Sequence, residues 1–160
     1  MGSDTEKRGK AVREMKVVGW RELVDLPELG LSGIPAKIDS GARTSSLHAE
    51  LLEEFERDGE RFVRFCVDWG GQRHECEAIH VDIRGITSSN GETQQRYVIK
   101  TPLVIGEKTH KVEISLADRS DMKFPMLVGR STLRRRFLVD SGHSWLQTPG
   151  MTPVKGHKPV

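Results

Sequence analysis

The residues with the clearest capacity for chemistry are Asp39-Ser40-Gly41-Ala42, which follow an apolar lead-in at residues 33–36. Asp39 stands where a strand is expected to end, and Gly41 lets the backbone reverse sharply. Such a turn holds a carboxylate at a fixed point beside backbone N–H groups, which suits a catalytic acid or base. It is also typical of an ordinary Asp-Ser-Gly loop. Asp39 is therefore a candidate catalytic residue, and Ser40, Gly41 and Ala42 form its turn.

A second stretch, residues 124–133, has a complementary pattern. An apolar run ends at Gly129-Arg130, and a short helical pattern follows. Asp-Ser-Gly-Ala, followed much later by two apolar residues and Gly-Arg, resembles the retropepsin-like aspartic peptidases. In that family the turn carries the catalytic aspartate, and the apolar-apolar-Gly strand passes beneath it. The resemblance assigns this supporting strand to Leu127, Val128, Gly129 and Arg130.

The resemblance narrows to one bacterial retropepsin-like family over residues 17–146. The matching motifs are Lys37 to Ala49, Arg96 to Lys100, Leu116 to Met122 and Pro125 to Arg130. This family is often labelled an ATP-dependent zinc protease. Some members are encoded beside an ATP-grasp ligase that adds glutamates to a ribosomal protein, and they are implicated in trimming that tail. The resemblance thus implies an aspartic-type peptidase that acts on an acidic, glutamate-rich peptide tail.

Aspartic peptidases need two carboxylates that share one proton, because two like charges in contact cannot both ionise. The chain has one complete catalytic turn, and the family solution is a symmetric homodimer that pairs two copies of Asp39. Asp140-Ser141-Gly142 repeats the tripeptide and offers an intramolecular alternative. However, no apolar-apolar-Gly strand follows Asp140, and too few residues remain for a second half-barrel. We therefore expect a homodimer and an ordinary strand-end turn at Asp140.

Arg43 departs from the viral retropepsins, which have an acidic residue at this position. That residue pairs with the arginine matching Arg130. Arg130 must therefore find another carboxylate, such as Asp118 or Asp121, or face solvent or substrate. An arginine beside the catalytic turn favours acidic peptides, because a guanidinium grips a carboxylate through two hydrogen bonds. Arg43 is a candidate substrate-binding residue, and a solvated surface arginine is the alternative.

His74, Cys76 and His80, with Cys66 across a hairpin, are residue types that bind zinc. Positions i, i+2 and i+6 of a straight strand span roughly 20 Å, too far to share one ion. No His-Glu-x-x-His motif occurs either. We expect no metal and no cofactor, and both cysteines buried as thiols. A zinc peptidase using this set and a non-catalytic β-barrel binding module are the alternative functions.

Runs of β-type sequence extend from Val17 to Asp140. The expected strands are residues 16–20, 34–38, 44–54, 61–69, 72–83, 96–105, 109–116 and 137–140. Residues 21–33 should form a connection with one helical turn, and residues 84–95 a long polar hairpin tip or loop. A short helix is expected at 131–136. The sum is six to eight strands with one helix near the C-terminus, an all-β, retropepsin-like closed barrel.

Length, composition and net charge limit the class of protein to which the chain can belong. The 160 residues suit one domain, and 36% hydrophobic with 30% charged residues is typical of a soluble globular protein. The net charge of +2 is too weak to predict direct nucleic-acid binding. No apolar run reaches membrane-spanning length, and the N-terminus lacks a signal core. We expect a cytoplasmic protein with a retropepsin-like domain at 14–148 and disordered tails at 1–13 and 149–160.

Overall fold

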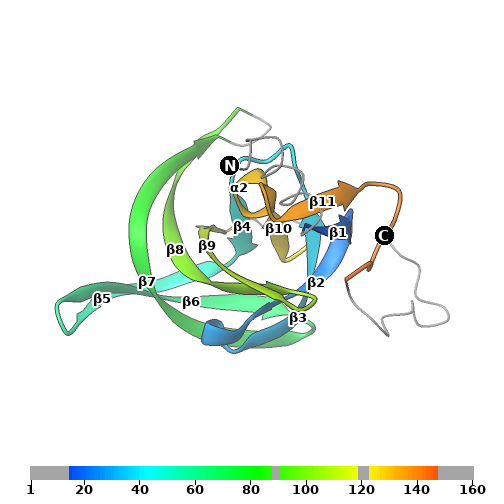
Figure 1. The fold of residues 1–160 in the computed structure, drawn as a ribbon. Helices are drawn as coiled ribbons and strands as arrows, with labels where there is room; N and C mark the ends of the chain where they lie inside the picture. The colour runs from blue at the N-terminus through cyan, green and yellow to red at the C-terminus, as the bar shows by residue number, and fades with distance from the viewer. Residues whose placement is uncertain (1–14, 88–90, 119–122, 148–160) are drawn as a thin grey trace, which may run out of the picture.

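A strongly twisted β-sheet closes on itself to form a barrel (Figure 1). The computed structural model describes residues 15–87, 91–118 and 123–147; both predicted tails, 1–13 and 149–160, lie outside these residues. The strands of the larger sheet are β2 (Arg21–Leu26), β3 (Leu31–Ile38), β4 (Ser45–His48), β5 (Glu50–Arg57), β6 (Glu60–Trp69), β7 (Gln72–Thr87), β8 (Thr93–Ile105), β9 (Lys108–Ala117) and β10 (Met126–Val128).

The order of strands in this sheet is β2-β3-β10-β4-β9-β8-β7-β6-β5. Asp25 on β2 also pairs with Val104 on β8, so the first six strands of that order form a closed ring of mixed direction. Strands β7, β6 and β5 continue outward from β8. The predicted closed β-barrel is therefore confirmed, with an additional extension on one side.

The core lies inside this ring, extends to β6 and β7, and follows from the alternation along each strand. On β3, for example, Ile34, Ala36 and Ile38 are buried while Lys37 is exposed. Because successive side chains of a strand point to opposite faces, this pattern places one face of β3 in the barrel. The largest fully buried side chains include Phe65, Leu47 and Met126, which come from β6, β4 and β10. The ends of β3 and β10 near the Asp39 turn are thus anchored by core packing.

A second, two-stranded sheet pairs β1 (Lys16–Gly19) in parallel with β11 (Phe137–Asp140). It packs beside the barrel, next to β2 (Figure 1). The fully buried carboxylate of Glu22 ties the two parts together, since it accepts hydrogen bonds from the backbone N–H groups of Gly19, Leu146 and Gln147. The chain after β11 is thereby held against the start of β2.

The described residues contain eleven strands, more than the six to eight expected. Arg21–Leu26 was expected to be a connection but is strand β2, which pairs with β3. Two buried charged residues, Arg21 and Glu22, open this strand and break the apolar alternation by which strands are recognised. The single helical turn expected here is η1 (Pro27–Leu29).

Two other boundaries differ from the sequence prediction. Residues 84–95 were expected to form a polar hairpin tip or loop; they belong to a hairpin, in which β7 and β8 stay paired as far as Thr87 and Thr93. The polar cross-strand residues of this hairpin carry no apolar alternation, which is why the predicted strands end at residue 83 and begin again at residue 96. The short helix near the C-terminus is confirmed as α2 (Arg130–Leu133), shorter than the expected 131–136. No helix in the described ranges is long and apolar enough to cross a membrane.

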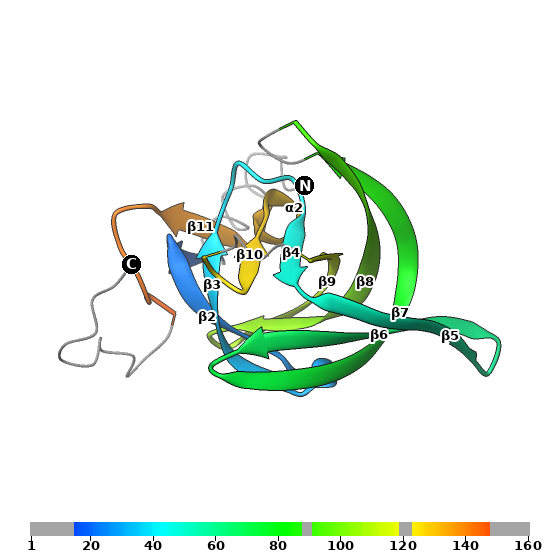
Figure 2. The same ribbon diagram turned by 180° about the vertical axis from the view of Figure 1, so that it is seen from behind.

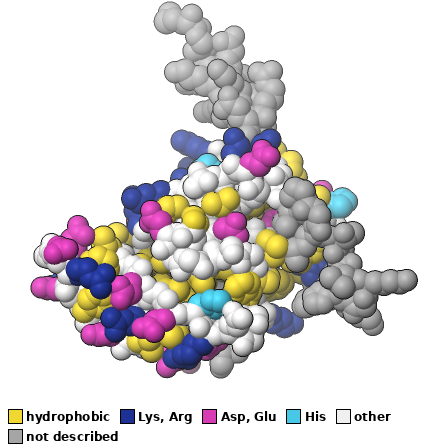
Figure 3. Space-filling view, turned by 90° about the horizontal axis from the view of Figure 1, so that it is seen from below, with side chains coloured by type: hydrophobic (Ala, Val, Ile, Leu, Met, Phe, Trp, Pro, Cys, Tyr) yellow, Lys and Arg dark blue, Asp and Glu magenta, His cyan; other side chains and the backbone are white. Residues whose placement is uncertain are grey.

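The hairpin of β5 and β6 projects from the barrel (Figures 1 and 2). Acidic, basic and hydrophobic side chains are interspersed over this extension (Figure 3). Arg64, for instance, forms ion pairs with Glu53 at 2.7 Å and with Glu77 at 3.3 Å. The aromatic rings of Phe55 and Phe62 stack at 5.5 Å. Cross-strand pairs of this kind stabilise a hairpin that has little core of its own.

Candidate active site

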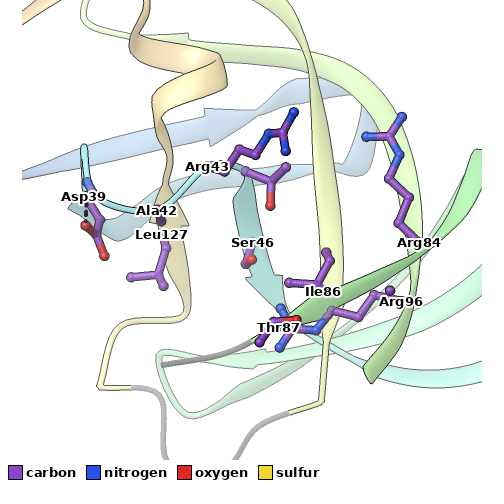
Figure 4. A pocket seen from close by; sticks show the side chains of 12 residues that line it. Asp39, Ala42, Arg43, Ser46, Arg84, Ile86, Thr87, Arg96 and Leu127 are labelled. Carbon is purple, nitrogen blue, oxygen red and sulfur yellow. Dashed lines mark hydrogen bonds between the residues drawn. The ribbon is translucent and has the colours of Figure 1, made fainter. Parts of the chain in front are cut away.

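Asp39 lies at the end of β3, at the point where the chain leaves the barrel wall. Its backbone N–H donates to the carbonyl of Val128 at 2.9 Å, which continues the pairing of β3 with β10 by one residue. The turn then closes through a hydrogen bond from the Ala42 N–H to the Asp39 carbonyl at 3.1 Å. The Gly41 N–H donates to Oδ1 of Asp39 at 3.1 Å (Figure 4). One oxygen of the half-buried carboxylate is therefore fixed by the turn itself.

Strand β10 lies between β3, which enters the turn, and β4, which leaves it (Figure 2). Leu127 pairs in parallel with Lys37 on β3 and antiparallel with Ser46 on β4. The structure thus places Leu127 and Val128 beside the turn, in the supporting position that the motif predicted. Any displacement of β10 would move both ends of the turn.

Gly129 allows the chain after β10 to pass against the back of the turn. A Cβ atom at this position would lie 2.5 Å from both the carbonyl carbon and the carbonyl oxygen of Thr44. Directly after it, the backbone N–H groups of Arg130 and Ser131 donate to the carbonyls of Ala42 at 2.7 Å and Arg43 at 3.0 Å. These two hydrogen bonds attach the start of α2 to residues 42 and 43, which follow Asp39 in the turn.

A buried hydroxyl pair completes this support and was not identified from the sequence. Ser45 Oγ accepts a hydrogen bond from the Gly129 N–H at 2.9 Å and lies 2.7 Å from Thr132 Oγ1. Both side chains are fully buried. The only signal in the sequence is that small polar residues flank each motif, and that pattern is too common to single out two of them.

The turn faces a cleft of about 860 Å³. One side is lined by Asp39, residues 41–44, Ser46 and Leu127, and the other by residues 84–87 of β7 and Arg96 of β8 (Figure 4). The β7–β8 hairpin therefore forms the wall opposite Asp39. Arg96 stands in a strand that the sequence predicted, but neither it nor residues 84–87, in the predicted hairpin tip or loop, was identified as part of a site.

The lining of the cleft is rich in arginine. Arg43, Arg84 and Arg96 line it, and Asp39 is the only carboxylate among its lining residues in the described ranges. The predicted substrate-binding residue, Arg43, is exposed at the cleft. The structure therefore places Arg43 beside Asp39 and adds two further guanidinium groups on the opposite wall.

Arg84 is held by two carboxylates. Its Nη1 and Nη2 atoms donate to Glu113 on β9 at 2.7 and 3.3 Å, and its Nε donates to Asp82 at 2.6 Å. The hydrogen bonds that Arg84 donates to Glu113, and then the one that it donates to Asp82, raise the pKa of Arg84 above its ordinary value. The Arg84 side chain is thus a permanently charged group in a fixed position.

Arg130 lies on the other side of the turn. It is exposed, and none of the carboxylates in the described residues pairs with it. Of the two predicted partners, Asp118 is exposed and makes no such pair, and Asp121 lies outside the described residues. Through its backbone Arg130 supports the turn, while its side chain faces solvent.

Asp140 forms a turn like that of Asp39 but in different surroundings. Its Oδ1 accepts a hydrogen bond from the Gly142 N–H at 3.0 Å, and its Oδ2 lies 2.7 Å from His143 Nδ1. Asp140 ends β11 in the small sheet and is not among the residues that line the cleft. The structure therefore does not bring Asp140 together with Asp39 in one cleft.

The residues considered for zinc point to separate partners. His74 packs on Trp69 with ring centroids 5.2 Å apart, and His80 Nε2 lies 3.2 Å from Glu54 Oε1. Cys76 is buried, and this burial raises the pKa of its thiol to about 11, which opposes the thiolate that zinc requires. Among the described residues, no three His, Cys, Asp or Glu side chains gather closely enough to hold a metal ion.

Comparisons with known proteins agree with this geometry. The sequence model of a family described as "RimB-like: Retropepsin-like aspartic endopeptidase RimB" matches residues 17–149. A probable alpha-L-glutamate ligase of Desulfotalea psychrophila is 40% identical over 129 residues, which cover 78% of this chain and 28% of the relative. A protein of the same description from Shewanella pealeana is 39% identical over 133 residues, which cover 81% of this chain and 29% of the relative. The chain therefore spans less than a third of the length of these relatives.

A solved structure shares the fold. It is the crystal structure of Lpg0085, a protein of unknown function from Legionella pneumophila, and it superposes with a TM-score of 0.73 at 26% sequence identity. The similarity covers 82% of this chain and 98% of that one. The barrel and its added strands are therefore a shared architecture rather than a peculiarity of this sequence.

Proposed function

The chain belongs to the RimB-like family of retropepsin-like aspartic endopeptidases, as its motifs predicted, and from this premise we propose that Asp39 catalyses the hydrolysis of peptide bonds. The observation that carries the proposal is the position of Asp39. Its carboxylate is oriented by its own turn, the turn is supported by β10, and the side chain lines a cleft large enough for a peptide segment.

In the proposed reaction two copies of Asp39 share one proton. The ionised aspartate removes a proton from a water molecule, whose oxygen attacks the peptide carbonyl carbon. The protonated aspartate donates its proton to the carbonyl oxygen, which gives a neutral tetrahedral diol. The diol then collapses, the C–N bond breaks, and a proton is transferred to the departing amine. No metal or other cofactor enters this scheme.

The second Asp39 would come from a second copy of the chain. Support comes from the small sheet, where Val17, Leu138 and Val139 are 40%, 43% and 37% exposed. This sheet is connected to the catalytic turn, because the Ile38 N–H donates to the carbonyl of Trp20, the residue after β1. We propose that these three apolar residues contribute to a two-fold contact. In such a contact the same surface is used by both copies.

We further propose that the substrate is an acidic, glutamate-rich peptide. The three arginines of the cleft provide the positive charge that such a peptide requires. The similarity to proteins described as probable alpha-L-glutamate ligases supports the same choice, since glutamate-bearing peptides are the products expected of a ligase of that description. The cytoplasmic location stays a prediction; both cysteines are buried free thiols, which suits a reducing compartment.

Replacement of Asp39 by Asn tests the proposed function. Asp39→Asn should lose at least about a thousandfold of its activity on a glutamate-tailed peptide, since amide groups cannot share the proton. Asp140→Asn is the matched control and should keep its activity, because Asp140 is not a cleft residue. An equal loss in Asp140→Asn would instead support the intramolecular dyad. Activity that is abolished by a chelator and restored by zinc would support a zinc peptidase.

A further inference from the structure

We infer that Arg96, supported by Arg84, is the specificity-determining residue of the cleft, and that it binds a carboxylate of the peptide substrate. The inference rests on the proposed peptidase function. It assigns the acidic preference to the β7–β8 wall rather than to Arg43, the arginine that adjoins the catalytic turn in the sequence.

The two arginines are direct cross-strand neighbours. Arg84 on β7 pairs with Arg96 on β8, and both line the cleft. Like charges placed directly opposite each other destabilise a β-sheet. A hairpin that holds two such residues at the wall of a cleft places two guanidinium groups there, and guanidinium N–H groups bind carboxylates.

The contacts of the two side chains give them different roles. Arg84 is fixed by the two hydrogen bonds that it donates to Glu113 and by its bond to Asp82, so its charge is largely balanced within the protein. Arg96 is only 6% exposed, and one of its contacts within the chain is from Nη2 to the amide oxygen of Gln94 at 3.4 Å. A guanidinium has five N–H donors, so Arg96 can keep its contacts within the chain and still donate to a carboxylate. Arg84 is therefore a fixed part of the cleft wall next to Arg96.

The burial of Arg96 distinguishes it from Arg43. Arg43 is exposed, and an exposed charge is screened by water and salt. A charge that is withdrawn from solvent attracts a carboxylate more strongly and is less sensitive to ionic strength. An acidic preference that depends on Arg96 should therefore persist at high salt, whereas one that depends on Arg43 should fade.

Two sources of carboxylate fit this site, a glutamate side chain and the free C-terminus of the peptide. Three peptides separate them: one with internal glutamates and an amidated C-terminus, one with glutamines and an amidated C-terminus, and one with glutamines and a free C-terminus. For each protein we would measure kcat/KM on all three and take the ratio of each carboxylate-bearing peptide to the amidated glutamine peptide. The ratio does not depend on the fraction of active protein in a preparation.

The native protein should prefer at least one carboxylate-bearing peptide, and Arg96→Gln should reduce that preference by about tenfold or more, mainly through KM. Arg73→Gln is the matched control. Arg73 lies on β7, the strand of Arg84, and like Arg84 it pairs with two carboxylates, Glu50 and Asp68, but it lies outside the cleft. If Arg96→Gln does not fold, Arg96→Lys replaces it, since lysine keeps the charge but loses the two-point geometry, and several-fold of the preference should still be lost.

The possible failures can be told apart. A native protein that cleaves peptides without any carboxylate preference would overturn the inference together with the acidic-substrate proposal, while leaving Asp39 as the catalyst. A native preference that survives in both Arg96 variants would overturn the inference alone. A preference that disappears in Arg43→Ala or in high salt, and is unchanged in Arg96→Gln, would show that Arg43 and not Arg96 determines the preference for a carboxylate.

Discussion

At the scale of single residues, Asp39 and Asp140 show that a local turn does not define a catalytic site. Each aspartate accepts a hydrogen bond on Oδ1 from the glycine two positions later, at 3.1 and 3.0 Å. Only Asp39 has β10 beneath its turn and a cleft in front of it. The function of the tripeptide therefore depends on Gly129 and the residues packed behind it.

Gly129→Ala is expected to damage the site through the backbone. Its new Cβ would meet the Thr44 carbonyl group at 2.5 Å, and backbone atoms cannot move aside cheaply. Overpacking of this kind costs about 1–3 kcal/mol of unfolding free energy, and peptidase activity should fall with it. Denaturant unfolding measures the first effect. Gly142→Ala is the control, because its Cβ would meet only Asp140 Oδ1, at an ordinary 3.5 Å; equal losses in both variants would contradict the explanation.

Cys76 predicts a pH dependence of stability. Burial raises the pKa of its thiol from 9.0 to about 11, so the folded protein favours the neutral thiol. This contribution is fully present below pH 9 and is lost as the pH rises to about 11, with a total of about 2–3 kcal/mol. The free energy of unfolding should therefore fall more steeply over this range in the native protein than in Cys76→Ala. Identical slopes would show that other groups control alkaline unfolding.

At the scale of elements, the central feature is the arrangement of β10 between β3 and β4. Ser45 on β4 accepts from the Gly129 N–H and contacts Thr132 in α2, so one hydroxyl connects three elements. The catalytic turn is therefore not a flexible loop but the meeting point of a small hydrogen-bonded network. Such buried networks are stabilising only when every member has a partner.

Ser45→Ala should be destabilising because it removes the partner of a buried N–H group. An unsatisfied buried donor costs about 1–3 kcal/mol, and the loss should appear in denaturant unfolding together with reduced kcat. Ser32→Ala on β3, where the side chain is exposed, provides the control and should change neither. A fully stable Ser45→Ala protein would mean that water replaces the hydroxyl.

The sequence predicted the turn, the supporting strand and most core strands, since each has a local signature such as Asp-Ser-Gly or an apolar run before Gly129. It failed where charge and burial coincide. β2 begins with the buried pair Arg21 and Glu22, and the end of β7 carries Arg84 just before Gly85, so neither segment has the apolar alternation of a strand. The partners that make these charges acceptable, such as Glu113, lie far away in the sequence.

At the scale of the whole molecule, the proposed mechanism needs a second carboxylate, and we propose that a second copy of the chain supplies it, so that one chain would be half of the active site. The cleft of the described chain contains one candidate aspartate, and the apolar residues Val17, Leu138 and Val139 are exposed on the neighbouring sheet. Association would bury these side chains and bring the second carboxylate to the first.

Mixing native protein with Asp39→Asn protein tests this association. If both aspartates are required and the subunits exchange, an equal mixture should keep about a quarter of the activity of the same total amount of native protein, because only native pairs are active. A monomeric enzyme would keep about half. Leu138→Asp should weaken association in sedimentation experiments and make activity depend on protein concentration; unchanged sedimentation would place the contact elsewhere.

The position of β10 also has a consequence for the order in which the protein is made. The turn at Asp39 is synthesised early, but the strand that supports it follows almost ninety residues later. A chain emerging from the ribosome therefore holds an unsupported Asp39 until residues 126–133 are available. Pairings between distant parts of a sequence form slowly, so proteolytic capacity should arise only at the end of folding. A peptidase of this design would be inactive toward its neighbours, and toward itself, until the chain has been synthesised through α2.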